Sequence, residues 1–464
     1  MLRTLLFLLI AVPGFVAALF NRFAALLLYC WFAFFRPEGF VWWDISGLRL
    51  SLLSGAILLG TCILSGRFPD VSHWISRGAL AFLALAAVSL PGASDIGSGL
   101  YWLDFLARLI IVCLLAITLV ETRWHLAALV AVVAGSFGFH SAKAGLASVL
   151  GGGVQFGLGL TGTFADNNGY ALGTVLTIPF LWAIGQNVGV ILGSYVHPHL
   201  NRVLRIGMNL AALLSVYTVV SLFSRGGFLG LLAIALVYIW FHPQRVRLFI
   251  SALVLAGVAA ATVPVPEGYL ERLQTIRPED GQFEDSAASR LHFWKVAVEM
   301  AIDRPLGVGL FNYADVYDQY DFLQGRYGRG RAVHSSHFQV LAELGFLGAL
   351  VWVGLFGRST LRLLKIRRWA AAALKEKKDD DTARFYVSMT TACLASMAGF
   401  VVGGSFIALA LNDLTWFTFA FVACLDRLAA KDGFAAVQKR AARPVAHVVA
   451  RPTRPRPAAM LRRP

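Results

Sequence analysis

The sequence has few charged residues for its length. Only 14% of its 464 residues are charged, whereas a soluble domain carries about a quarter, and 58% are hydrophobic. The apolar residues form blocks long enough to cross about 30 Å of hydrocarbon, at about 20 residues for each helix. This composition argues against a soluble protein and predicts an all-α fold, a polytopic membrane bundle of about twelve transmembrane helices.

Paired cysteines and metal-binding motifs are also lacking. The five cysteines lie in or beside apolar blocks without paired spacing, at positions 30, 62, 113, 393 and 424. Such isolated cysteines are typical of small buried side chains. No CxxC or HExxH motif suggests zinc or haem. We therefore expect neither a metal nor a cofactor.

The apolar blocks place the predicted spans. They lie near residues 3–20, 48–65, 78–92, 99–120, 124–140, 169–187, 206–223, 227–241, 247–263, 345–364, 385–408 and 411–426. The glycine-rich run from Gly145 to Gly162 is expected to form a loop rather than a helix.

These spans divide the chain into five parts. We predict an N-terminal transmembrane half (1–204), central helices around a Ser-Arg-Gly turn (205–263), a large loop carrying the active site (264–344), C-terminal helices (345–426) and a basic disordered tail (427–464).

Positive charge predicts which side each loop occupies. Lys and Arg gather in alternate short loops and in the tail, which marks these as cytoplasmic and places the tail on anionic membrane lipid rather than on nucleic acid. The loop 264–344 then faces outside, although it is itself rich in basic residues: Arg272, Arg277, Arg290, Lys295, Arg304, Arg326, Arg329 and Arg331. We therefore expect an anionic ligand there.

The large loop also pairs arginine with histidine. Residues 289–302 read as an interfacial helix, Pro305 to Gly309 force a turn, and a second helix begins near His334, capped by Ser335 or Ser336. Transfer of a sugar from a prenyl diphosphate needs cations that hold the leaving diphosphate, and arginine suits that task. It also needs a base with a pKa near neutrality, which suits histidine.

Specific residues follow from these two needs. The candidate base is His334, or His337 on the same helix face, and the candidate diphosphate ligands are Arg225, Arg290, Lys143, Arg329 and Arg331. Asp166, Asn167 and Asn168 are candidates for binding sugar hydroxyls, and a helix cap is an equal alternative for this segment. Likewise, Arg290 on an interfacial helix could extend to lipid phosphate, and either histidine could serve packing.

In these residues the chain resembles the O-antigen ligase and O-antigen polymerase superfamily. The shared elements are Ser224-Arg225-Gly226, Arg290 to Trp294, Pro305 to Gly309, and His334-Ser335 followed by Glu343-x-Gly345. With Arg36-Pro37-Glu38 and Thr163 to Asn168 added, it also looks like the exosortase-associated putative O-glycosylation ligase subgroup.

This resemblance implies a glycosyltransferase of the bacterial inner membrane. It implies metal-independent, inverting transfer of a glycan from undecaprenyl diphosphate, at the periplasmic face, to a lipid A core sugar, a protein or another glycan. A polymerase of the same superfamily is the first alternative. A transporter or flippase of lipid-linked solutes is the second, although the spans hold almost no charge apart from Asp104 and Arg108, which we expect to pair.

Overall fold

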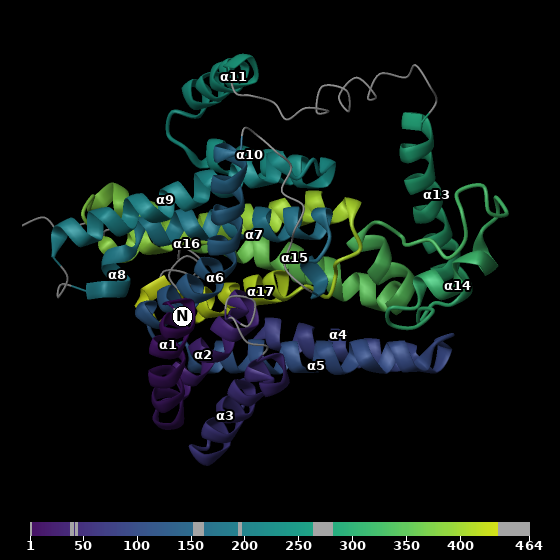
Figure 1. Ribbon diagram of the computed structural model, residues 1–464, viewed down its shortest axis with the longest axis horizontal. Coiled ribbons are helices and arrows are strands. Elements are labelled where there is room, and N and C mark those ends of the chain that lie inside the picture. Colours follow the sequence, from purple (N-terminus) through teal and green to yellow (C-terminus); the bar gives the residue numbers. More distant parts are fainter. Residues whose placement is uncertain are drawn as a thin grey trace, which may run out of the picture.

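The chain folds into a bundle of helices (Figure 1). The computed structural model describes residues 2–37, 41, 45–151, 162–193, 197–262 and 282–434, and within these ranges it contains sixteen α-helices and no strand. The predicted all-α class is therefore confirmed. Seven helices are long and apolar enough to cross a membrane, so the chain is a multi-pass membrane protein by its candidate spans: α1 (Leu2–Phe20), α4 (Trp74–Ser89), α5 (Ile96–Leu119), α6 (Arg123–Leu150), α9 (Pro198–Ser221), α15 (Ser336–Glu376) and α16 (Asp381–Gly403).

The other helices are shorter or less apolar. They are α2 (Arg22–Phe35), α3 (Leu50–Leu64), α7 (Asn167–Gln186), α8 (Val188–Leu192), α10 (Arg225–Phe241), α11 (Arg245–Thr262), α13 (Gln282–Asp303), α14 (Tyr313–Tyr320) and α17 (Asp413–Ala429). Each of the twelve predicted spans falls on one helix of these two sets. The exact number of spans stays a prediction.

Helices α7 and α16 form the centre of the bundle. Nearly every residue of α7 is buried, and the helix packs against α6, α9, α10 and α16. Apolar residues around its whole circumference allow this burial. The Ser396 hydroxyl of α16 donates to the Leu176 carbonyl of α7 at 3.0 Å. The N-terminus of α7, which carries predicted site residues, is therefore held on a rigid core.

The glycine-rich run from Gly145 to Gly162, which was predicted to be a loop, begins inside a helix. Helix α6 continues to Leu150, so the first part of the run is helical, and residues 152–161 lie outside the described ranges. A Cβ atom on Gly145 would lie 2.0 Å from the Leu214 carbonyl oxygen of α9. Glycine here permits close helix contact, a use common between membrane helices. The expectation of a loop at Gly145 was therefore wrong.

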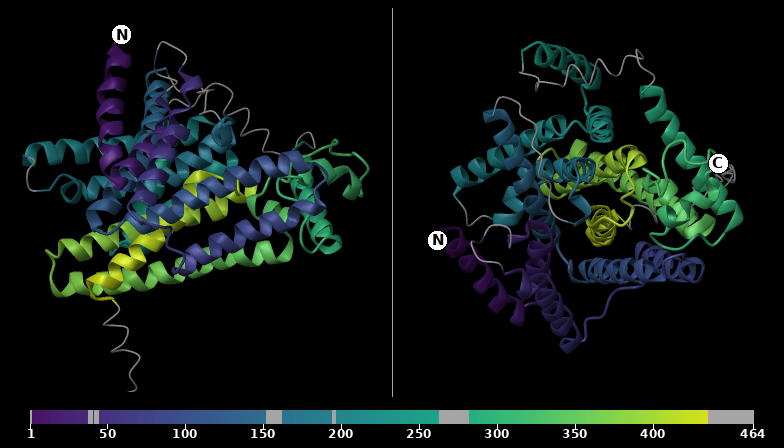
Figure 2. Two further views of the ribbon diagram at one scale, coloured as in Figure 1. Left: turned by 90° about the horizontal axis from the view of Figure 1, so that it is seen from below. Right: turned by 45° about the vertical axis from the view of Figure 1, so that its right-hand side comes forward.

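The large loop is partly described, because residues 263–281 lie outside the described ranges. The remainder carries α13 and α14, at the right-hand end of the molecule in Figure 1 and in the left view of Figure 2. The two helices share a small core with the start of α15, which includes Phe293, Tyr313 and Tyr317. Helix α13 covers the predicted helix 289–302 but begins earlier, at Gln282. The predicted helix start near His334 is confirmed, because Ser335 caps α15 by accepting from the Phe338 amide. Helix α15 is kinked at Gly345, where φ is 67°.

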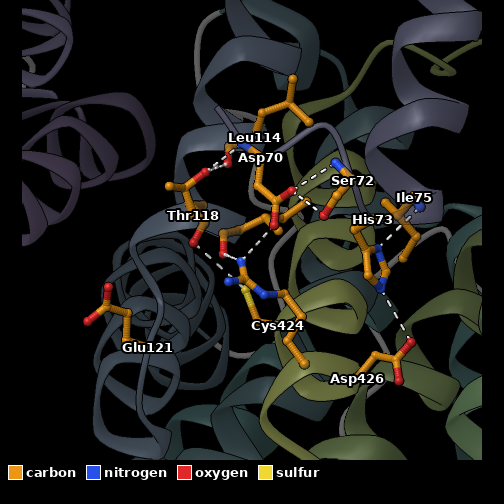
Figure 3. A network of polar contacts seen from close by, with 12 residues as sticks. Asp70, Ser72, His73, Ile75, Leu114, Thr118, Glu121, Cys424 and Asp426 are labelled. Carbon is orange, nitrogen blue, oxygen red and sulfur yellow. Dashed lines mark hydrogen bonds and ion pairs between the residues drawn. The ribbon is translucent and has the colours of Figure 1, made fainter. Parts of the chain in front are cut away.

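At the end of the bundle away from α13 and α14, charged side chains of opposite sign pair with one another (Figure 3). We call this group the closed network. His73, before α4, lies 3.3 Å from the Asp426 carboxylate of α17, which also accepts from Arg362 of α15 at 2.5 Å. Arg427 lies 3.3 Å from Asp70. These contacts join α4, α15 and α17. The first residues of the predicted tail, 427–434, are helical: α17 runs to Ala429, and a short π-helix follows (Ala430–Phe434). The rest of the tail lies outside the described residues.

Candidate active site

The Ser-Arg-Gly turn opens α10 and is attached to the start of α7. Phe223 has a φ of 54°, in the left-handed region that side chains other than glycine rarely adopt. Ser224 caps α10 by accepting from the Gly227 amide at 3.1 Å, and its hydroxyl donates to the Asn168 side chain at 2.8 Å. A Cβ atom on Gly227 would lie 2.8 Å from that of Ala171. The turn is thus fixed against α7, and it presents Arg225 as an exposed side chain.

Arg225 and Arg290 line the same cavity. The cavity measures about 160 Å³, which is room for several water molecules at roughly 30 Å³ each. Arg290 projects from α13, is partly buried, and lies over the Phe406 ring at 5.7 Å from its centroid. Burial and the positive charge of Arg225 lower the pKa of the Arg290 guanidinium. Two cations are therefore held near one another in a partly enclosed space that suits an anion.

His334 lies beside this pair of arginines. Its backbone has a φ of 47°, directly before the Ser335 cap, and its partly buried ring lies 5.9 Å from that of Phe293. Burial lowers the pKa of His334, and the charges of Arg290 and Arg331 lower it further, whereas Asp166 opposes the shift. The imidazole does not line the cavity itself. Arg290 nevertheless acts electrostatically on both Arg225 and His334, which places the three in one neighbourhood.

His337 has a different environment. Its Nδ1 accepts a hydrogen bond from the Trp352 indole at 3.1 Å, and its Nε2 lies 2.9 Å from the Val401 carbonyl oxygen. An imidazole that accepts at one nitrogen and donates at the other is neutral and fully occupied. These contacts link the two halves of the kinked helix α15 to each other and to α16. Because both nitrogens of His337 are engaged, His334 is favoured as the group that takes a substrate proton.

Two glycine motifs in the large loop interlock. The Val308 amide donates to the Ala342 carbonyl at 2.9 Å, and the Phe346 amide donates to the Pro305 carbonyl at 3.2 Å. A Cβ atom on Gly307 would lie 2.1 Å from the Glu343 carbonyl oxygen, and one on Gly345 would lie 1.9 Å from that of Pro305. The turn after α13 is thereby seated in the kink of α15, which fixes the position of α13 relative to His334.

The Glu343 side chain completes this junction. Its buried carboxylate accepts from the Phe311 amide at 2.9 Å, and Asn312 beside it bonds to the backbone of Asp95 at 2.6 and 3.1 Å. The Phe311 ring stacks on Trp102 of α5 at 4.1 Å. The sequence shows both glycine motifs but not that they touch each other.

The segment 166–168 forms a helix cap and contributes to the cavity. Asp166 caps α7 by accepting from the Asn168 and Gly169 amides at 2.9 and 3.0 Å. Asn168 lines the cavity and accepts from Ser224, whereas Asn167 begins the helix. The cap that the sequence allowed as an alternative is present, and a sugar contact by these residues stays a prediction.

The remaining predicted cations lie elsewhere. Lys143 is on α6 and does not line the cavity. Arg329 and Arg331 follow α14 and do not line it either. The Arg331 guanidinium lies over Phe293, at 5.9 Å from the ring centroid. Phe293 is therefore a neighbour of both Arg331 and His334.

Two features of the site escaped sequence reasoning. Gly403, at the end of α16, and Phe406 and Ile407, in the connection to α17, line the cavity, and such apolar residues give no chemical signal in the sequence. His292 is buried and lies 2.8 Å from the equally buried Asp321 carboxylate. This pair connects α13 to the segment after α14. In the sequence, the only signal for it is that a histidine and an aspartate can form an ion pair. Among the described residues, no group of three or more His, Cys, Asp or Glu could hold a metal ion.

The segment that holds these motifs matches a known protein family. Residues 210–353 match the family described as O-Antigen ligase. The O-antigen ligase match includes Arg225, Arg290, His334 and both interlocking glycine motifs. It does not extend to the N-terminal half, so the exosortase-associated subgroup stays a prediction. No curated protein matches the chain.

Proposed function

We propose that this protein transfers a glycan from undecaprenyl diphosphate to an acceptor hydroxyl on a lipid A core sugar or a protein. One observation carries the proposal: Arg225 and Arg290, from separate helices of the segment that matches O-Antigen ligase, line one cavity next to His334. Like charges repel, so this arrangement is stabilised when an anion binds between them. A diphosphate supplies that anion.

Each residue has a defined role in the reaction. The two guanidinium groups hold the diphosphate through charge-assisted hydrogen bonds. The acceptor oxygen attacks the anomeric carbon of the donor as the bond from that carbon to the diphosphate oxygen breaks. His334 takes the hydroxyl proton, and undecaprenyl diphosphate leaves with its negative charge neutralised by the arginines. Attack opposite the leaving group inverts the anomeric configuration and needs no metal.

The backbone at the site supports this assignment. Phe223 and His334 both adopt left-handed conformations, directly before the cavity turn and directly before the α15 cap. Such backbone strain gathers at functional sites, where it places a side chain that relaxed geometry would not. We propose that Asp166, Asn167 and Asn168 contact sugar hydroxyls near the diphosphate.

The membrane arrangement follows from the sequence. We infer about twelve spans in the bacterial inner membrane, with both termini cytoplasmic and the cavity facing the periplasm. Lipid-linked donor then reaches the arginines from the outer leaflet of that membrane. The exosortase-associated subgroup fits this arrangement, and the membrane lipids are the protein's other partners.

The deciding experiment is transfer by full-length protein purified in detergent. A fluorescent oligosaccharide on undecaprenyl diphosphate is incubated with lipid A core oligosaccharide or with envelope protein, in the presence of a metal chelator. We expect labelled acceptor and free undecaprenyl diphosphate. Intact donor at the end of the reaction, together with transport of that donor by the same protein reconstituted in vesicles, would identify a transporter instead.

A polymerase is separated from a ligase in cells. A strain that lacks a ligase accumulates full-length chains on the lipid carrier, whereas a strain that lacks a polymerase loses the long chains. We expect accumulation. For transport, the sequence singled out one charged pair in the spans, Asp104 and Arg108. These two residues form an ion pair on α5, and both side chains are more than half exposed rather than enclosed in the bundle.

A further inference from the structure

The loop after α14 concentrates positive charge. Gly325 to Arg331 alternates glycine with arginine, and Gly325, Gly328 and Gly330 all have positive φ values. Arg329 and Arg331 are exposed, and no acidic side chain in the described part of the chain forms a salt bridge with either. We call residues 325–331 the arginine loop.

Two acids hold the arginine loop in shape. The buried Asp321 carboxylate accepts from the Leu323 amide at 2.9 Å and the Gly325 amide at 2.6 Å, and it faces His292 at 2.8 Å. Burial opposes charge on this group, but the hydrogen bonds and His292 hold the pKa of Asp321 below its usual value. At the far end, Asp318 accepts from the Gly330 amide at 2.9 Å. These carboxylates bind the backbone of the loop rather than its guanidinium groups.

The arginine loop lies near His334, but its arginines do not line the cavity of Arg225 and Arg290. Arg290 and Arg331 both act on His334 electrostatically, one from α13 beside Arg225 and the other from the loop. The Phe293 ring lies 5.9 Å both from the Arg331 guanidinium and from the His334 ring. An anionic group bound at Arg331 would therefore lie near His334, the proposed base.

We propose that the arginine loop binds the acceptor, and that this acceptor is an acidic glycan with carboxylate or phosphate groups close to the accepting hydroxyl. Arg329 and Arg331 lie two residues apart, so their Cα atoms are separated by at most about 7 Å, and the two long side chains can engage neighbouring charged sugars. Guanidinium groups match both oxyanions in a bidentate way. This inference rests on the proposed function, because it takes His334 as the base.

The test measures binding by full-length protein in nanodiscs of phosphatidylcholine. The probes are fluorescent oligogalacturonate, a phosphorylated oligomannoside, and the methyl-esterified or dephosphorylated form of each. We expect at least one acidic probe to bind about tenfold or more tightly than its neutral counterpart, with an affinity that falls as salt rises.

Variants locate the binding site. The double substitution Arg329→Gln and Arg331→Gln should abolish the preference for the acidic probe and leave binding of the neutral probe unchanged. The double lysine variant should restore part of the preference, since it keeps charge but not bidentate geometry. Lys375→Gln with Lys378→Gln removes the same charge from exposed positions near the end of α15 and should have no effect.

The outcomes separate this inference from the proposed function. Equal binding of acidic and neutral probes, or a glutamine variant that keeps the preference, overturns the acidic acceptor. So does a variant that loses only binding to phosphatidylglycerol vesicles, because the loop would then contact lipid. If instead His334→Ala binds the acidic probe but still transfers glycan, the assignment of the base fails while the arginine loop retains its ligand.

Discussion

Both ends of the helical bundle place a histidine among arginines, but with opposite surroundings. At the end shown in Figure 3, His73 lies 3.3 Å from Asp426, and Arg362 and Arg427 contact Asp426 and Asp70. At the cavity end, the charges that act most strongly on His334 are the cations of Arg290 and Arg331. There Arg290 and Arg331 lie over the rings of Phe406 and Phe293 rather than against carboxylates.

The difference separates a structural network from a binding site. Where each cation faces a carboxylate, the charges are satisfied by the protein itself, and their effect is to hold helices together. At the cavity end, Arg225 and Arg290 line one space, and a bound anion would relieve the repulsion between them. The same residue types therefore indicate a structural network at one end and support the proposed anion site at the other.

Replacing the histidine at each end gives the largest contrast. His334→Ala should lower the rate of glycan transfer by about 10²-fold or more, because general bases contribute on that scale. His73→Ala and His337→Ala should keep the rate per folded molecule. The measurement is transfer by purified protein at matched folded concentration, and equal losses in all three variants would remove His334 from its role.

Replacing one arginine at each end comes next. Arg290→Gln should weaken transfer by about 100-fold, since hydrogen bonds to charged groups contribute roughly 1.5–3 kcal/mol and a bidentate contact makes two. Arg290→Lys should recover part of the loss. Arg362→Gln serves as the control and should reduce thermal stability rather than transfer. Initial rates against donor concentration check this, and normal donor use by Arg290→Gln would contradict the assignment.

Breaking the closed network should cost stability alone. Asp426→Asn removes the carboxylate that His73 and Arg362 share and should lower the free energy of unfolding by about 2 kcal/mol, less than a fully buried pair because Arg362 is partly exposed. Thermal unfolding in detergent measures the change. A loss of transfer without loss of stability would show that the two ends are coupled.

The smallest effect is on pH dependence. Catalysis needs the neutral imidazole, and burial with Arg290 and Arg331 lowers the pKa of His334, so the rate should fall only when pH drops below the usual range for histidine. Arg331→Gln removes one lowering charge and should move this fall to higher pH. Asp166→Asn removes the opposing carboxylate and should move it to lower pH. Rate profiles that shift in the reverse directions would exclude His334 as the titrating group.

The sequence predicted the helices, and it singled out Arg225 and Arg290, which line one cavity, because these signals are local. Apolar blocks marked each span, and Ser335 before α15 marked a cap. Gly145 was misread because its role depends on Leu214 in another helix. His334 and His337 were indistinguishable for the same reason: the Trp352 and Val401 contacts that occupy His337 form only in the folded chain.

The interlocked glycines have a consequence for how such a protein can diversify. The contacts between Pro305, Gly307, Glu343 and Gly345 run through main-chain atoms, so they hold the same geometry whatever side chains surround them. The arginine loop is held separately, by Asp318 and Asp321, so its exposed residues can change without disturbing these main-chain contacts. Under the proposed function, changes at a few exposed positions would adapt one site to new acceptors.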